Sequence, residues 1–346
     1  MGKKLFDYVI GNPPYQEDTN DTSDKPVYNY MLDAAYKISE RAEFITPARF
    51  LFNAGKTPKQ WNQKMLNDSH LTVMFYEQQS EKIFPNTDIK GGVVITYRDT
   101  NKNYGEIGTF TACSELNEIL KRVTHTADFE SIEGIVYVQN KFDLYTLYLD
   151  HPEFINIIGS SGKEKRLTTA IFSQLSVFSD ERTKPTDLKI LGLIENKRHY
   201  RYIDPKYITP HENLNKYKVI VPKSNGTGAI GEVLSTPLIG EPLIGEPLIG
   251  YTQSFISIGA FNTKTEAEAL FKYIKSKFAR TMLGILKVTQ DNNKGVWQYV
   301  PLQDFTSASD IDWSKSIHEI DLQLYRKYGL DEKEIEFIES HVKEMA

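Results

Sequence analysis

The sequence predicts an α/β fold: a partial, doubly wound, parallel-rich sheet, followed by a mixed α+β region and C-terminal helices. Two observations support this prediction. Over residues 1–112, short continuous apolar runs alternate with helical patterns, as in strands that are buried between layers of helices. Beyond residue 150, shorter strand-like segments are separated by turns, and the acidic residues 304–346 show helical spacing.

The N-terminal region contains four predicted strands, each bounded by turn residues. They span residues 8–10, 43–47, 71–76 and 92–97. Apolar residues at helical spacing predict one helix over residues 28–38 and a second that starts after Pro58 and runs through Leu66. The first strand is continuous and apolar, so we expect it to be buried on both faces.

A polar and aromatic turn, Asn12-Pro13-Pro14-Tyr15, directly follows the first strand. Each proline fixes its own φ and favours an extended residue before it, so the turn is stiff and exposes carbonyl groups. Asn12 adds a side-chain carbonyl, and Tyr15 adds an aromatic face. Open α/β sheets bind ligands at the carboxyl ends of strands. The motif therefore predicts a site for a planar, amine-bearing ring, such as an adenine turned out of a duplex.

With this motif the sequence resembles the amino-methylating DNA methyltransferases, whose catalytic motif is Asn/Asp/Ser-Pro-Pro-Tyr/Phe/Trp. The Asn-Pro-Pro-Tyr form is typical of adenine-N6 enzymes, although cytosine-N4 enzymes share the pattern. The resemblance implies a Rossmann-like catalytic sheet of a Type II restriction-modification enzyme of the fused kind. In that sheet Asn12 and the Pro13 carbonyl would hold the target amine. Tyr15 would stack on the base, and Phe84 would close the pocket opposite it. A core phenylalanine at the start of a strand is the alternative for Phe84.

The resemblance also implies S-adenosylmethionine as the methyl donor, bound in a Gly-rich turn between a strand and a helix. Only eleven residues precede Asn12, and the C-terminal helices contain no such turn. We therefore expect most of the donor site to be missing from this chain, with its cofactor-binding residues unknown. An upstream methyltransferase half, in the same parent chain or in a separate subunit, would complete the enzyme, and the chain alone would be inactive. Direct methyl transfer needs no metal.

Residues 182–223 carry ten lysines and arginines against four acidic residues, a local net charge of +6, with tyrosines and histidines between them. Basic and aromatic side chains together suit phosphate contacts and the recognition of base edges, although a solvated basic face is the ordinary alternative. We expect six of these side chains to contact double-stranded DNA: Lys197, Arg198, Arg201, Lys206, Lys218 and Lys223.

The later segments resemble target-recognition domains of restriction-modification enzymes. Strands are predicted over residues 189–194, 217–221, 255–259 and 297–301, and a helix over residues 264–286, followed by Gln290. The predicted domains are therefore a catalytic half at 1–112, a connecting segment at 113–150, a recognition domain at 151–303 and an acidic helical appendage at 304–346. Helices are expected over residues 114–123, 317–328 and 331–342, a strand over 134–138, and an amphipathic segment over 141–149.

Three further patterns resemble nucleotide-binding or nuclease motifs. Residues 226–231 have the spacing of a dinucleotide fingerprint, but they run towards Pro237 rather than into a helix, so a glycine hairpin is favoured. Gly55-Lys56-Thr57 lacks the first glycine of a phosphate loop, because Phe50 occupies that position. It is assigned to a surface turn, with DNA phosphates as an alternative partner of Lys56 and Lys59. Acid-x-Lys triplets at 187–189 and 331–333 are assigned to charged surface rather than to a nuclease.

A pentapeptide ending in Pro-Leu-Ile-Gly occurs three times in tandem over residues 236–250. Proline and glycine in each unit oppose a continuous helix or a central strand, so the repeat is predicted to be a tolerant loop. As a hypothesis, the number of copies changes the reach of the recognition domain.

The composition excludes several other kinds of site and of protein. Cys113 is the only cysteine, which excludes a disulfide framework and a cysteine-based zinc cluster within this chain. No apolar run approaches the roughly 20 residues of a membrane span, so a cytoplasmic protein is expected.

The alternative function is a non-catalytic DNA-binding specificity module that acts beside a separate methylating subunit.

Overall fold

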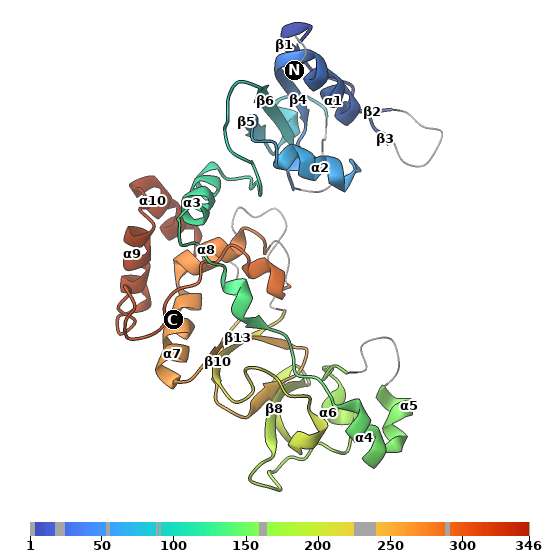
Figure 1. Cartoon of the computed structure of the whole chain (residues 1–346), viewed down its shortest axis with the longest axis vertical. Helices are drawn as coiled ribbons and strands as arrows, with labels where there is room; N and C mark the ends of the chain where they lie inside the picture. The colour runs from blue at the N-terminus through green and yellow to red at the C-terminus, as the bar shows by residue number, and fades with distance from the viewer. Residues whose placement is uncertain are drawn as a thin grey trace. The chain divides into compact units, whose positions relative to one another are not determined.

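The apolar run before the Asn-Pro-Pro-Tyr motif forms one edge of a four-stranded sheet (Figure 1). The computed structural model describes residues 4–17, 25–52, 56–87, 89, 91–158, 165–224, 240–287 and 291–345. By internal contacts the chain divides into an N-terminal unit, Met1–Ser114, and a C-terminal unit, Glu115–Ala346. No helix in the described ranges combines the length and the apolar character that a membrane crossing requires.

The N-terminal unit is built on a mixed sheet with the strand order β1-β4-β6-β5. Its strands are β1 (Phe6–Gly11), β4 (Ser39–Pro47), β5 (Leu71–Glu77) and β6 (Val93–Asp99). All four predicted strands are thus confirmed. Of the three pairings, only β1 with β4 is parallel, while β6 runs antiparallel to both β4 and β5. The prediction of a parallel-rich sheet is therefore wrong for this part of the chain.

Strand β1 is more exposed than its apolar sequence predicts. Phe6, Tyr8 and Ile10 are 52%, 41% and 71% exposed, whereas Val9 packs against the core. Among the described residues β1 pairs only with β4, so its outer edge and part of each face remain uncovered. The prediction of a strand buried on both faces is wrong.

Helices α1 (Tyr28–Ile38) and α2 (Lys59–Leu66) confirm the two helices predicted in this unit. A short ribbon of β2 (Gln16–Glu17) and β3 (Lys25–Pro26) precedes α1, and 3₁₀ turns span Ala48–Phe52 and Ser80–Lys82. Trp61 on α2 meets the ring of Tyr28 edge-on at 5.9 Å and that of Phe50 at 5.4 Å. These aromatic contacts fix α1, α2 and the first 3₁₀ turn to one another at the end of β4.

The described residues of the C-terminal unit form two sheets. Strands β7 (Val136–Tyr137), β10 (Tyr217–Pro222), β11 (Leu243–Gly245) and β13 (Phe255–Phe261) form an antiparallel sheet with the order β11-β10-β13-β7. Strands β8 (Leu188–Ile194), β9 (Lys197–Ile203) and β12 (Ile249–Tyr251) form the second sheet, with the order β12-β8-β9.

Helices surround these sheets and make up the end of the chain (Figure 1). They are α3 (Ser114–Thr124), α4 (Leu144–Asp150), α5 (Ile155–Ile158), α6 (Ile171–Gln174), α7 (Lys264–Lys275), α8 (Lys277–Gly284), α9 (Ile317–Lys327) and α10 (Glu332–His341). Further 3₁₀ turns span Ile132–Ile135, Pro152–Phe154, Pro205–Tyr207 and Lys294–Trp297. Helix α7 packs on β10 and β13, and α9 and α10 both pack on α8.

Two predicted elements differ from the structure. The helix predicted over residues 264–286 is two helices, because Ser276 is extended and its side chain caps α8 by accepting a hydrogen bond from the N–H of Ala279 at 3.1 Å. The strand predicted over residues 297–301 is wrong. Trp297 ends a 3₁₀ turn, and only Pro301 forms an isolated bridge, to Ser131.

The second and third copies of the tandem repeat supply strands to different sheets. Leu243–Gly245 pairs with β10, and Ile249–Tyr251 pairs with β8. The copies fit closely, since a Cβ atom on Gly245 would lie 2.8 Å from Ile220 Cδ1 and one on Gly250 would lie 2.7 Å from Ile190 Cδ1. A tolerant loop is therefore the wrong description of residues 240–250. Residues 236–239 of the first copy, the glycines at 226–231 and Gln290 lie outside the described residues.

A buried carboxyl group joins the C-terminal helices to the unit. Asp321 on α9 is 1% exposed and accepts hydrogen bonds from the backbone N–H groups of Lys277 and Phe278, at 3.0 and 2.9 Å. Burial raises the pKa of Asp321 to about 6, and the nearby Glu339 carboxylate adds to this effect. The two N–H groups and the Arg280 guanidinium oppose it.

Asp321 should make the stability of the C-terminal unit depend on pH. Its folded pKa lies above its ordinary value, so its stabilising contribution is present in acid and is lost as the pH rises through about 6. Relative to Asp321→Asn, the free energy of unfolding of the unchanged protein should be about 2 kcal/mol higher at about pH 4.5 than at about pH 7. Denaturant titrations followed by the fluorescence of Trp297 and Trp313, in a Trp61→Phe background, measure this difference. The same pH dependence in both proteins would contradict the prediction.

Candidate functional site

The Asn-Pro-Pro-Tyr turn and the end of β4 lie at the same edge of the N-terminal sheet. Strands β1 and β4 are parallel, and Gly11, the last residue of β1, is paired with Phe44. Their carboxyl ends therefore point the same way, which brings residues 12–15 towards Pro47 and Arg49. A Cβ atom on Gly11 would lie 3.2 Å from the Phe44 ring, so a small residue suits the last position of β1.

Within the turn, Asn12 and Pro14 are exposed, Pro13 is buried and Tyr15 is half-buried. The Tyr15 carbonyl accepts a hydrogen bond from the N–H of Val27 at 3.2 Å. The Tyr15 hydroxyl is shielded from solvent and has no hydrogen-bond partner among the described residues. Burial raises the pKa of Tyr15, so the phenol is neutral near neutral pH.

Phe84 lies beside Tyr15, with the two ring centres 6.4 Å apart. The ring planes meet at 68°, an edge-to-face contact, so a base stacked between them would require at least one ring to turn. Ser80 holds the loop that carries Phe84. Its hydroxyl donates to the Thr87 carbonyl at 2.7 Å, it accepts from the N–H of Ile89 at 2.8 Å, and its carbonyl accepts from the N–H of Phe84.

Gly92 links this loop to the end of β4. Its φ of +80° is in the left-handed region, and a Cβ atom there would lie 2.3 Å from the Glu77 carbonyl oxygen. Its own carbonyl accepts from the N–H of Ala48 at 3.0 Å. Glycine at this position therefore allows β6 to begin next to the 3₁₀ turn that carries Arg49.

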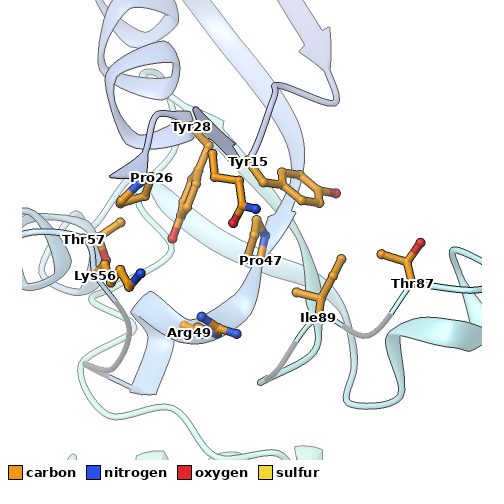
Figure 2. Close-up of a pocket in the computed structure, with 10 residues that line it drawn as sticks. Tyr15, Pro26, Tyr28, Pro47, Arg49, Lys56, Thr57, Thr87 and Ile89 are labelled. Atoms are coloured by element: carbon orange, nitrogen blue, oxygen red, sulfur yellow. The ribbon is translucent and has the colours of Figure 1, made fainter. Parts of the chain in front are cut away.

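A cavity of about 310 Å³ opens next to Tyr15, as Figure 2 shows. Its described lining residues are Tyr15, Gln16, Pro26, Tyr28, Pro47, Arg49, Lys56, Thr57, Thr87 and Ile89. The walls come from the Asn-Pro-Pro-Tyr turn, the β2–β3 ribbon, the start of α1, the end of β4 with the 3₁₀ turn after it, the segment before α2 and the loop after Phe84. The cavity is large enough to take a small planar ligand.

Tyr28 forms part of the cavity wall and is buried. Burial raises the pKa of Tyr28 to about 12, while a hydrogen bond with Thr57 and the charge of Arg49 act in the opposite direction. The cavity thus combines aromatic surface, hydroxyl and amide groups, and the cations Arg49 and Lys56.

Lys218 does not belong to a DNA-contacting surface, contrary to the sequence prediction. Its side chain is completely buried, and its Nζ donates to the carbonyl oxygens of Asn213 and Lys216 at 2.8 and 2.9 Å. Burial lowers the pKa of Lys218 to about 7. Its role in the structure is to hold the chain that precedes β10, and no DNA phosphate can reach it in this fold.

The other predicted DNA contacts lie in different environments. Lys197 is exposed at the tip of the β8–β9 hairpin, next to a turn in which Glu195 and Asn196 both have positive φ. Arg198 donates to the Glu241 carbonyl, and its guanidinium lies 5.9 Å from the centre of the Phe255 ring.

Arg201 and Lys206 each form an ion pair, Arg201 with Asp180 and Lys206 with Asp150. Lys223 is partly buried just beyond β10, where its backbone N–H donates to the Ser254 carbonyl at 2.9 Å. The structure therefore does not gather the predicted cations into one free basic surface.

Arg49 and Tyr28 line the cavity but were not predicted as site residues. A signal for Arg49 was present in the sequence, because it comes two residues after the strand end Ile45-Thr46-Pro47. Parallel strands end at one edge of a sheet, so a cation placed there lies near the Asn-Pro-Pro-Tyr turn. Tyr28 was assigned to the apolar face of α1, where it also packs.

Comparisons with known proteins gave one family match and several similar solved structures. Residues 1–84 match the model of the Eco57I restriction-modification methylase family. Among solved structures, the chain is similar to the type IIG restriction endonuclease BpuSI, with a TM-score of 0.35 and 10% identity over 97% of this chain and 53% of that one. It is also similar to the type IIL restriction-modification enzyme MmeI in complex with DNA, with a TM-score of 0.35 and 11% identity over 96% of this chain and 56% of that one.

The chain thus spans about half the length of these two structures. A comparison with curated protein sequences gave no match. Residues 1–84 are thus similar to restriction-modification methylases of this family.

Proposed function

We propose that this chain carries the base-binding pocket and the DNA-recognition part of a site-specific adenine-N6 DNA methyltransferase from a Type II restriction-modification system. One observation carries the proposal. The Asn-Pro-Pro-Tyr turn lies at the shared carboxyl edge of β1 and β4, with the Phe84 ring 6.4 Å from that of Tyr15. The family match over the same residues is independent support.

The chemistry follows from the residues of the turn. The exocyclic amine of adenine is a poor nucleophile because its lone pair is delocalised into the ring. The Asn12 side-chain carbonyl and the Pro13 backbone carbonyl are acceptors for its two hydrogens, and they stabilise the positive charge that develops on the attacking nitrogen. Tyr15 and Phe84 hold the ring of the extruded base.

The methyl group comes from S-adenosylmethionine in this proposal. The described residues include no Gly-rich turn from a strand into a helix that fits this donor. We propose that an upstream methyltransferase half, in the same parent chain or in a separate subunit, supplies that site. The exposed side chains of Phe6, Tyr8 and Ile10 on β1 support this partner, because a neighbouring strand would cover them.

The test is a transfer assay with labelled S-adenosylmethionine and duplex DNA. The chain is assayed alone and after co-expression with the protein encoded upstream, and donor binding is measured by calorimetry in both cases. Donor binding and transfer only in the combined sample would support the proposal. Donor binding by the chain alone would refute the divided donor site, and no transfer in either sample would refute the methyltransferase function.

The two rings of the pocket should matter for base capture rather than for folding. Tyr15→Ala or Phe84→Ala should each weaken capture of an extruded base by about 10-fold to 100-fold, since base–aromatic stacking contributes about 1–3 kcal/mol. The fluorescence of 2-aminopurine at the target position of a duplex measures capture by the combined sample. Phe75→Ala is the matched control, because Phe75 is an exposed ring on β5 outside the pocket. Capture that is unchanged in Tyr15→Ala would contradict the assigned role.

A further inference from the structure

Ser80 is buried at the start of the loop that carries Phe84. Its hydroxyl donates to the Thr87 carbonyl at 2.7 Å and accepts from the N–H of Ile89 at 2.8 Å. Thr87 and Ile89 both line the cavity, and Figure 2 shows them on the side where the Tyr15 ring lies. One side chain thus ties two cavity residues, seven and nine positions further along the chain, to the start of the loop.

The backbone of Phe84 is held at both of its hydrogen-bonding groups. Its N–H donates to the Ser80 carbonyl at 2.8 Å, and its carbonyl accepts from the N–H of Thr87 at 3.2 Å. The second bond closes a four-residue turn with Pro85 in its second position and Asn86, at a φ of +66°, in its third. Proline followed by a residue with positive φ is typical of a type II turn. A change in the position of the Phe84 ring therefore comes from rotation about its side-chain bonds.

The distance between the rings of Tyr15 and Phe84 is close to the distance at which they would enclose a base. A flat base between two parallel rings separates their planes by about 7–8 Å, because carbon atoms in contact lie about 3.5–4.0 Å apart. The ring centres are 6.4 Å apart, and the planes meet at 68°. A base therefore fits between the rings once one ring rotates and the ring centres separate by about 1 Å.

We propose that Ser80 is a positioning residue for base capture. Its two hydrogen bonds hold Phe84 near the spacing that the extruded base needs, so that rotation of a ring is the main change when the base enters. Holding the ring in place beforehand reduces the conformational freedom that is lost on binding. This inference rests on the proposed function and adds to it a residue that acts through Phe84 rather than on the base.

The test measures capture of 2-aminopurine at the target position of a duplex, by the chain combined with the protein encoded upstream. Ser80→Ala should weaken capture by about 5-fold to 10-fold, because two hydrogen bonds of the loop are lost while both rings remain. In a Phe84→Ala background the same substitution should change capture by less than about 2-fold, since the ring that Ser80 positions is absent. An equal loss in both backgrounds would show a general effect on the fold and would overturn the inference, as would unchanged capture in Ser80→Ala.

Two variants separate positioning from the mere loss of a buried hydroxyl. Ser39→Ala removes a buried hydroxyl that donates to the Ala35 carbonyl at 2.8 Å, at the opposite end of β4 from Pro47, and it should leave capture unchanged. Ser80→Cys keeps a side chain of similar size that forms only weak hydrogen bonds, so it should lose capture as Ser80→Ala does. It also replaces Ser80→Ala if that variant does not fold. Full capture by Ser80→Cys would overturn the assignment of the effect to the two hydrogen bonds.

Hydrogen exchange of the chain alone tests the loop without DNA. The N–H of Ile89 loses its acceptor in Ser80→Ala, so peptides that contain Phe84 and Ile89 should exchange faster than in the unchanged chain. Peptides from α1 should exchange at the same rate in both proteins. Unchanged exchange around Ile89 would overturn the inference.

The ring variants separate this inference from the proposed function. If Tyr15→Ala and Phe84→Ala lose capture while Ser80→Ala keeps it, the inference fails and the base pocket stands. If neither ring variant changes capture, the base pocket itself is refuted, and the positioning role of Ser80 falls with it.

Discussion

Replacing Asn12 by alanine is expected to slow methyl transfer by about 100-fold to 1000-fold in the complete enzyme. In the proposed mechanism the substitution removes one of the two acceptors for the target amine, and loss of one preorganised catalytic group costs about 3–4 kcal/mol of transition-state stabilisation. Single-turnover transfer to duplex DNA measures the rate, and 2-aminopurine fluorescence shows whether the base is still captured. Asn12 is exposed, so the stability of the protein should hardly change.

A conservative variant gives the control. Asn12→Asp keeps a side-chain acceptor, and aspartate occurs in the motif of the resembling family, so its rate should lie between those of Asn12→Ala and the unchanged protein. Near-normal transfer by Asn12→Ala would contradict catalysis at this turn. It would favour the alternative function, a specificity module beside a subunit that methylates with its own motif.

Removing two copies of the tandem repeat is expected to destabilise the C-terminal unit by about 3 kcal/mol or more. Deletion of residues 236–245 removes β11, and with it two partly buried apolar side chains, Leu243 and Ile244, and the pairing with β10. For a unit of this size the melting temperature should fall by about 6–12 °C. Thermal unfolding followed by circular dichroism measures the change.

Deletion of a single copy, residues 236–240, is the matched comparison. Both β11 and β12 remain, and only the connection between β10 and β11 becomes shorter, which changes stability by less than about 1 kcal/mol. If both deletions have the same effect on melting, the copies do not have the separate structural places described here. Methylation of the same DNA site after the single deletion would also remove the hypothesis that copy number sets the reach of recognition.

The sequence predicted local elements better than their pairing. The strand at residues 92–97 is evident from its own apolar run, but its place between β4 and β5, antiparallel to both, depends on residues far away in the chain. The same dependence on distant residues explains why β1 is more exposed than predicted. Its apolar residues indicated burial, while its position at the edge of the described sheet leaves Ile10 exposed.

The predictions for the candidate site show the same difference between local patterns and tertiary packing. Tyr15 and Phe84 were expected to meet because a known chemical motif relates them, and their rings are in contact. Lys218 was misplaced because lysine normally lies at the surface. The residues around it, Tyr217 and Val219–Val221 in a continuous apolar run, were the available sign that this lysine enters a core.

The exposed edge of β1 also bears on how the protein behaves during expression. An apolar strand with unpaired N–H and C=O groups is a template for strands of other molecules, and proteins usually cover or charge such edges. Here Phe6, Tyr8 and Ile10 are left open to solvent in the described structure. In a cell that makes this chain without a covering partner, we expect part of it to enter aggregates. Co-synthesis with the proposed upstream half should return it to the soluble fraction.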